Sequence, residues 1–162
     1  FGLSIETAKS PPMSSNAPSP DLIDPFEHSL DYQLRRASFG SLQWLMAQFA
    51  RIDLKVTDAA IIRVIDANPG CNQGGIARLL GMQRANIVPL ITALVDRQIV
   101  RREAADGRTN ALYLTEKGEE YRDQICVLGQ EHETLFFGDM PEAMRATLMD
   151  AARRIRGHVD GQ

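Results

Sequence analysis

The chain contains few of the residues and spacings from which catalytic and metal sites are built. It has two cysteines, Cys71 and Cys126, which lie 55 residues apart and form no CxxC pair, so the default in a reducing compartment is two free thiols. We find no phosphate-binding glycine loop, no nucleophile–base pair and no paired carboxylates. The three histidines are scattered without a second ligand at metal-site spacing: His28, His132 and His158. The sequence therefore predicts neither an enzyme, nor a cofactor, nor a metal site.

Long apolar runs are also absent. No segment approaches the roughly 18 apolar residues that span a bilayer, and the N-terminus lacks a basic region followed by an apolar stretch. We therefore expect no membrane association and a cytoplasmic location. What is present is a hydrophobic content of 44% in 162 residues, which is enough for one packed domain or two small ones.

Charge is distributed unevenly along the chain, although the net charge is only −3. Residues 71–118 hold seven Arg and Lys against four acidic residues, whereas residues 1–31 hold one lysine against five acids. Residues 119–162 are acidic as well, with five basic residues against nine acids. Because a phosphate backbone responds to local charge, the segment 71–118 is the candidate nucleic-acid surface.

The N-terminal residues 1–25 are rich in serine and proline (SPPMSSNAPSPDLIDP), a composition that cannot bury a core. We interpret them as a flexible arm. Met13 is a candidate natural start, which would make residues 1–12 a vector-derived extension.

Apolar periodicity predicts a series of helices interrupted by one strand pair. Residues 27–51 carry a wide apolar stripe, and Thr57 resembles an N-cap for a helix over 58–67. Asp139 resembles the cap of a last helix. Between them we expect helices over 74–80 and 83–97, strands over 99–103 and 111–115, and a long helix from 115 to about 129 or 136.

The predicted helix over 83–97 has one apolar face and one face of small or polar residues. Arg84 and Asn86 lie in its first turn, where Arg can pair with guanine and Asn with adenine. Val88 and Thr92 follow on the exposed side and suit contact with thymine methyl groups. Pro89 falls near the sixth helical position, where it removes one backbone hydrogen bond and is expected to bend the helix.

Two segments, IARLLGMQRANIVPLITALVDRQIVRR and DGRTNALYLTEKG, together resemble the multiple-antibiotic-resistance-regulator (MarR) family of bacterial transcription factors. The second matches the family wing pattern of an Asp, one residue, an Arg, and a strand that ends in Leu-Thr before a Gly. The likeness covers about residues 27–158. It implies a mainly α fold with a small β-wing, in which residues 56–118 form a winged helix-turn-helix. Residues 26–55 and 119–162 would then be dimerisation helices.

The resemblance and the residue chemistry imply a homodimer that binds a pseudo-palindromic site on double-stranded DNA. Arg108 at the wing tip suits a narrow minor groove, and the resemblance implies that Asp106 braces the wing by pairing with an arginine. The other candidate residues either contact phosphates, which positions the protein on the DNA, or flank the start of the predicted helix over 83–97. The full set is Gln83, Arg84, Asn86, Val88, Thr92, Arg101, Arg102, Asp106, Arg108, Thr109 and Asn110.

Family members often release DNA when a small molecule binds between the dimerisation helices and the winged helix. The aromatic side chains of the first helix, with Arg63 as a partner for a carboxylate, favour an aromatic acid or its acyl-coenzyme-A derivative as the effector. The candidate pocket residues are aromatic or polar groups on the first two helices: Phe39, Gln43, Trp44, Arg51 and Arg63. An aromatic stripe at helical spacing is more often part of a packed core than of a ligand pocket.

Three interpretations therefore remain. The first is a ligand-released transcriptional repressor. The second is a winged-helix protein-interaction module, which the acidic flanks favour. The third is a redox-sensing regulator, for which Cys71 beside a helix N-terminus is the candidate thiol.

Overall fold

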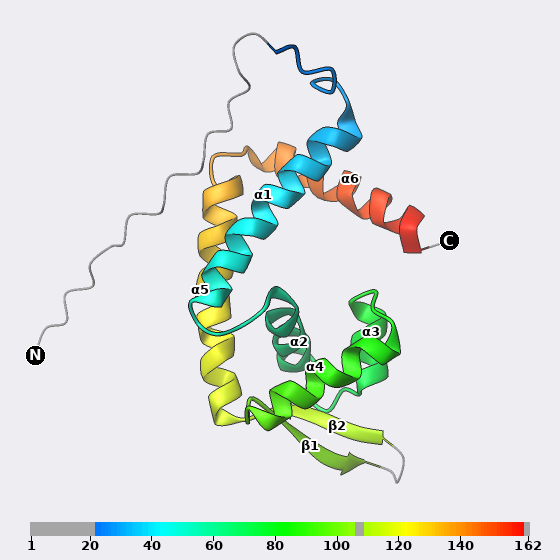
Figure 1. Ribbon diagram of the computed structural model, residues 1–162, viewed down its shortest axis with the longest axis vertical. Coiled ribbons are helices and arrows are strands. Elements are labelled where there is room, and N and C mark those ends of the chain that lie inside the picture. Colours follow the sequence, from blue (N-terminus) through cyan, green and yellow to red (C-terminus); the bar gives the residue numbers. More distant parts are fainter. Residues whose placement is uncertain (1–21, 106–108, 161–162) are drawn as a thin grey trace, which may run out of the picture. The chain divides into compact units, whose positions relative to one another are not determined.

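The computed structural model describes residues 22–105 and 109–160. This part of the chain contains six helices and one two-stranded sheet, which are labelled in Figure 1. The order along the chain is α1 (Leu30–Ala50), α2 (Val56–Ala67), α3 (Gln73–Leu79), α4 (Arg84–Asp96), β1 (Val100–Ala105), β2 (Thr109–Leu114), α5 (Glu116–Phe137) and α6 (Glu142–Asp160). The mainly α fold with a small β-wing is confirmed.

The chain divides into two compact units, Phe1–Ala37 and Ser38–Gln162, so their boundary falls inside α1. In the first unit, the Phe26 ring lies 5.0 Å from the Tyr32 ring, and the Gln33 amide donates to the Glu27 carbonyl at 3.0 Å. The second unit contains the remaining elements and the hydrophobic core.

Isoleucine dominates that core, and it comes from every element of the predicted helix-turn-helix. Each of the largest core side chains is almost fully buried, and its burial stabilises the fold by roughly 1.5–3 kcal/mol. Because the same cluster contains residues of α2, α3, α4 and both strands, these elements share one interior. Its largest members are Ile61, Ile62, Ile65, Ile76, Ile87, Ile91, Leu94, Ile99, Val100 and Leu112.

The helix-turn-helix has conventional end signals. Asn72 caps α3 by accepting a hydrogen bond from the Gly75 amide at 2.9 Å. Gly81, between α3 and α4, has a φ of +64°, a left-handed conformation that favours glycine. The turn therefore forms where the sequence predicts it.

The wing pairs β1 with β2 in antiparallel register, from Val100 opposite Leu114 to Ala105 opposite Thr109. A bridge between Cys71 and Leu112 extends the sheet, because the Leu112 amide donates to the Cys71 carbonyl at 2.9 Å. The bridge ties the start of the helix-turn-helix to the base of the wing. Sequence periodicity did not indicate it, since a single bridging residue has no period.

Two predicted caps are wrong. α2 begins at Val56, and the Asp58 carboxylate accepts from the Lys55 amide at 3.1 Å, so Thr57 lies within the first turn. α6 begins at Glu142, where the Pro141 carbonyl accepts from the Arg145 amide at 3.0 Å; Asp139 therefore precedes the helix without capping it. In both cases the first backbone hydrogen bonds of the helix set where it begins. The residue whose type is most typical of an N-cap does not.

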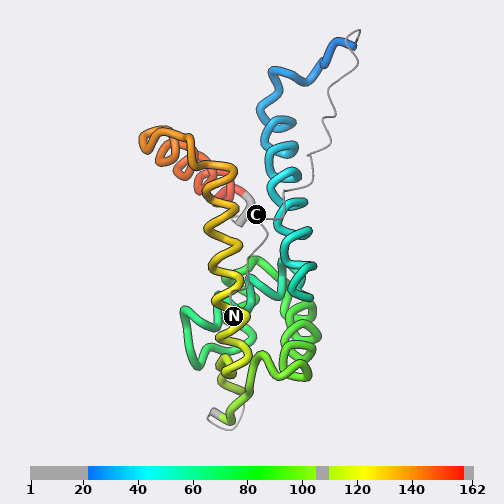
Figure 2. The backbone as a smooth tube through the Cα atoms, turned by 90° about the vertical axis from the view of Figure 1, so that its left-hand side faces the viewer, coloured from blue at the N-terminus to red at the C-terminus, as the bar shows by residue number. Residues whose placement is uncertain are grey.

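The first turn of α5 packs against the corner between α4 and β1. Thr115 caps α5 by accepting from the Gly118 amide at 3.0 Å, and its hydroxyl donates to the Gln98 carbonyl at 2.6 Å. From there α5 runs as one continuous helix to the turn before α6 (Figure 2). In the part of the chain that is described, no helix is both long enough and apolar enough to cross a bilayer.

Gly118 should be essential to this corner. A Cβ at this position would lie 2.2 Å from the Ile99 carbonyl oxygen, which is backbone and cannot swing away. We expect Gly118→Ala to lower the free energy of unfolding by about 1–3 kcal/mol, the usual cost of overpacking. Chemical denaturation measures this change.

Gly129 of the same helix is the matched control, since a Cβ there meets nothing within 4 Å. Gly129→Ala should stabilise the protein by up to about 1 kcal/mol through helix propensity. Equal effects of the two substitutions would contradict the close approach of α5 to Ile99.

Candidate nucleic-acid interface

Helix α4 has one face in the core and one face open to solvent. Ile87, Ile91 and Leu94 recur at helical spacing and are fully buried. The opposite side is exposed and consists of small or polar groups, which allow close approach to another surface. Its members are Arg84, Ala85, Asn86, Val88, Pro89 and Ala93.

Pro89 lies inside α4 without ending it. A residue at this position would donate its amide to the carbonyl four residues back, which is that of Ala85. Both residues are exposed, so water can satisfy the carbonyl that loses its partner. The hydrogen bond that Pro89 removes therefore lies on the solvent-exposed face of the helix, and α4 continues to Asp96.

The N-terminal end of α4 presents the predicted polar residues. Gln83 is the N-cap residue, with extended backbone, and its side chain does not cap the helix. Arg84 and Asn86 occupy the first turn and are exposed. The positive end of the helix dipole therefore lies beside a guanidinium and an amide, a combination suited to an anionic partner.

A cavity of about 530 Å³ opens between the starts of α3 and α4 and strand β2. We call it the α3–α4 cavity. It brings Arg84 and Asn110 together with Arg78, which sequence analysis did not select. The available signal was that Arg78 is the one charged residue of α3. The remaining lining residues are Asn72, Gln73, Gly74, Ala77 and Met82.

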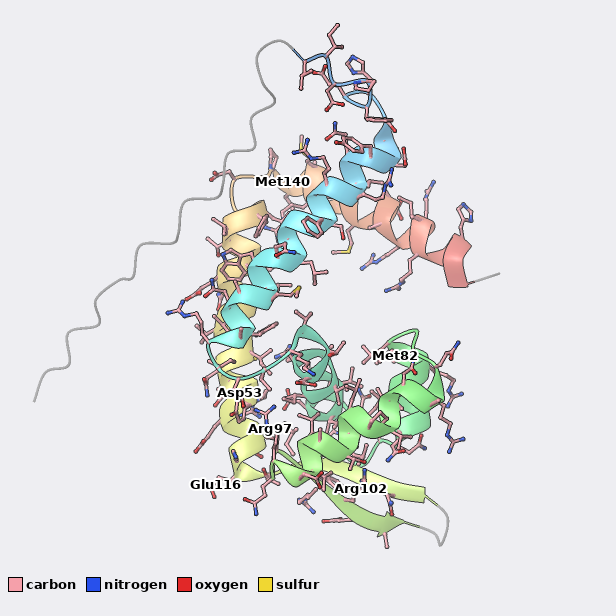
Figure 3. The ribbon with its side chains drawn as sticks, in the orientation of Figure 1. Asp53, Met82, Arg97, Arg102, Glu116 and Met140 are labelled. Carbon is pink, nitrogen blue, oxygen red and sulfur yellow. The ribbon has the colours of Figure 1, made fainter. Side chains whose placement is uncertain are left out.

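The arginines of β1 already have partners. Arg102 donates from Nη2 to the Thr92 hydroxyl at 2.8 Å, which joins the wing to the middle of α4 (Figure 3). Arg101 pairs with Glu103 and lies 4.6 Å from the centroid of the Tyr113 ring. These bonds fix the position of the wing base relative to α4. Asp106 and Arg108 lie outside the described residues, as does the side chain of Thr109.

The five candidate effector residues do not share one pocket. Phe39 and Gln43 are exposed on α1, whereas Trp44 packs 5.5 Å from the His132 ring and 6.4 Å from the Phe136 ring. Trp44 therefore belongs to an aromatic cluster between α1 and α5. Arg63 of α2 donates to the Cys126 sulfur of α5 at 2.5 Å.

A second cavity, of about 540 Å³, lies between the end of α1 and the middle of α5. We call it the α1–α5 cavity. Arg51 lines it, alone among the candidate effector residues, and donates to the Gln48 side chain at 2.9 Å. The other lining residues are apolar or carry carboxylates and amides: Gln48, Ile52, Asp123, Gln124, Val127, Leu128 and Glu131.

The cysteines and acidic residues do not form a metal site in the described ranges, where no group of three or more potential ligands gathers. Cys71 and Cys126 are free thiols. Burial raises the pKa of the Cys71 thiol, which opposes the low pKa expected of a redox-sensing cysteine.

Comparison with known proteins places this geometry in context. The model of the MarR family matches residues 52–109, which span the helix-turn-helix and most of the wing. The transcriptional regulator HosA of Escherichia coli O127:H6 is 25% identical over 130 residues, covering 75% of this chain and 96% of HosA. A putative transcriptional regulatory protein for the hcr operon of Thauera aromatica is 26% identical over 136 residues, covering 78% of each chain.

Solved structures extend the likeness beyond the winged helix. The transcriptional repressor CouR bound to a 23-mer DNA duplex superposes with a TM-score of 0.76 at 27% identity, over 84% of this chain and 99% of that one. CouR bound to p-coumaroyl-CoA gives 0.72 at 26% identity, over 83% and 96%. The chain is therefore similar to MarR-family regulators in the sequence of residues 52–109 and in its fold.

The relatives and solved structures that the chain resembles are transcriptional regulators. In this context α3 and α4 are the helix-turn-helix and β1 and β2 are the wing. The predicted α4 residues lie on the open face of that unit, and the α3–α4 cavity lies at its edge.

The two thiols should differ in reactivity. Because burial raises the pKa of Cys71, less of it is thiolate at neutral pH, and it should react with iodoacetamide more slowly than exposed Cys126. Mass spectrometry of partially labelled protein measures the two rates separately. Cys71→Ser and Cys126→Ser assign the peaks, and faster labelling of Cys71 would restore the redox-sensing interpretation.

Proposed function

We propose that this chain is a homodimeric MarR-family repressor that binds a specific DNA sequence and leaves it when a small molecule binds. The observation that carries the proposal is the exposed face of α4, which is anchored from behind by buried isoleucines. Arg84 and Asn86 project from its first turn, beside a cavity that also contains Arg78 and Asn110. The structural likeness to DNA-bound CouR supports the same function.

The arrangement suggests a division of roles among the polar residues. Arg84 and Asn86 at the helix start have the geometry for base edges in a major groove. Arg78 and Asn110, at the rim of the α3–α4 cavity, suit the flanking phosphates. Arg102 and Thr92 bond to each other, so we assign them to holding the wing on α4. Val88 is exposed on α4, and we assign it to contact with a base.

Helix α6 supports the homodimer. None of its described side chains is buried, yet Met144, Leu148 and Ile155 form one apolar stripe along its 19 residues. An isolated helix of this length is marginal in water, because most helical stability comes from packing of the apolar face. A second copy of the chain is the partner that we propose for this stripe, and a dimer would also double the positive charge offered to DNA.

The proposed effector remains an aromatic acid or its coenzyme-A thioester, the class of molecule to which CouR is bound in the structure named above. Of the residues that we expect to contribute, Arg51 offers a guanidinium at the α1–α5 cavity. Phe39, Gln43, Trp44 and Arg63 would reach the same molecule only if the helices move or a second copy completes the site.

Substitution of arginines on α3 and α4 should separate recognition of bases from recognition of phosphates. We expect Arg84→Ala to cost about 1–3 kcal/mol of binding to the preferred sequence and to relax its selectivity. Arg78→Ala should weaken binding to all sequences and reduce the slope of log K against log salt by about 1. Fluorescence polarisation at several salt concentrations measures both effects.

Arg63→Ala is the charge-matched control, because Arg63 lies on α2 and contacts α5. It should leave affinity within about twofold, in line with the small effects of most surface substitutions. If the three variants bind alike, the assignment of α3 and α4 as the DNA-contacting surface is wrong.

Charge on the α6 stripe should disrupt the dimer. We expect Leu148→Asp to produce a monomer in analytical ultracentrifugation and to weaken binding to a two-half-site DNA far more than binding to a single half-site. Asp150→Ser, on the same helix but off the stripe, is the control. A Leu148→Asp protein that remains dimeric would exclude α6 as the interface.

A further inference from the structure

The C-terminal end of α4 is bonded to the loop between α1 and α2. Arg97 is the C-cap residue of α4, and its Nη2 donates to the Asp53 carbonyl at 2.6 Å and to the Asp53 carboxylate at 3.1 Å. Figure 3 shows the two residues beside each other. The Asp53 side chain is 94% exposed, so the ion pair itself contributes little, and the backbone carbonyl is the main anchor.

Helix α5 holds the same residue from another side. The Arg97 guanidinium carbon lies 5.8 Å from the centroid of the Tyr121 ring, within the range of a cation–π contact. The Lys117 ammonium donates to the Arg97 carbonyl at 3.0 Å. Arg97 therefore connects three segments: the end of α4, the α1–α2 loop and the first turns of α5.

The two anchors of Arg97 adjoin the two walls of the α1–α5 cavity. On one wall, Arg51 and Ile52 directly precede Asp53 in the chain. On the other, Gln124 lies about one helical turn after Tyr121. A molecule that moves these walls apart would move Asp53 away from Tyr121 and so disturb both contacts of Arg97.

The α1–α2 loop is built to transmit such a displacement. The amides of Arg51, Ile52 and Asp53 donate to carbonyls three residues back, at 3.1–3.2 Å, and the Leu54 amide returns to the Phe49 carbonyl at 2.9 Å. Asp53 has a φ of +54°, so it closes the loop in a left-handed conformation that tolerates little rotation. The loop therefore moves as one piece with its cavity wall.

We propose that Arg97 is a positioning residue that couples the α1–α5 cavity to the orientation of α4. The inference rests on the proposed function, since it supplies the route by which a bound molecule changes the presentation of the DNA-contacting helix. Arg97 touches neither DNA nor the cavity in this scheme. Its role is to make α4 follow the separation between the α1–α2 loop and α5.

The coupling can be tested without knowing the effector, by filling the cavity with a side chain. Gln124→Trp places an indole in the α1–α5 cavity, and Glu119→Trp places one on an exposed position of α5 that lines neither cavity. Each is made with Arg97 present and in an Arg97→Gln background. Val127→Trp fills the same cavity from another position, should Gln124→Trp fold poorly.

With Arg97 present, Gln124→Trp should weaken DNA binding by at least about fivefold, the lower range of allosteric coupling. In the Arg97→Gln background the same change should alter binding by less than about twofold, because the substitution of Arg97 removes the connection to α4. The difference between the two backgrounds is the coupling that a double-mutant cycle measures. Glu119→Trp should be silent in both. Asp53→Asn keeps the carbonyl anchor and should preserve the coupling. Equal effects of Gln124→Trp in both backgrounds would overturn the proposal.

Hydrogen exchange separates failure of this inference from failure of the proposed function. The Arg97 and Gln98 amides are bonded to the Ala93 and Val95 carbonyls at the end of α4. Gln124→Trp should accelerate their exchange only when Arg97 is present, whether or not the protein binds DNA. If no DNA is bound but this pattern appears, the coupling stands and the DNA function fails. Exchange that is unchanged, or accelerated in both backgrounds, rejects the coupling.

Discussion

The structure depends on the corner at Ile99, where three functional parts of the chain meet. The Ile99 amide donates to the Leu94 carbonyl at the end of α4, and its own carbonyl accepts from the Thr115 amide before α5. The side chain is fully buried, and the absence of a side chain at Gly118 lets α5 approach the Ile99 carbonyl. At this corner the end of α4, the start of β1 and the start of α5 therefore cannot move independently of one another.

This constraint also explains how a protein with a net negative charge can hold its basic residues on one structural unit. The acidic residues gather in the flanking segments, whereas the described arginines of 71–118 lie on α3, on α4 with its C-cap, and on β1. The bond from Arg102 to Thr92 fixes the wing base against α4, and Arg97 ties the far end of α4 to Asp53. The proposed coupling therefore runs from α1 and α5 to α4 through bonded elements, not through a flexible linker.

The sequence predicted the elements of the winged helix well, because isoleucine periodicity, Gly81 and Asn72 are local signals. It missed the caps of α2 and α6, where backbone bonding overrides the preferred residue type. It grouped Phe39, Gln43, Trp44, Arg51 and Arg63 by their order on two helices, but the structure turns them toward different neighbours. The Arg97–Asp53 contact depends on tertiary approach, so no local pattern could indicate it.

The most direct test of the account is selection of bound fragments from a random-sequence DNA library by the full-length protein. A homodimer with one exposed α4 in each copy should enrich an inverted repeat whose half-sites are about 10 base pairs apart, centre to centre. Enrichment of such a repeat, lost when Arg84 is replaced by alanine, is the predicted result. Recovery of sequences with no shared motif would contradict the assignment of α4 as a DNA-reading helix.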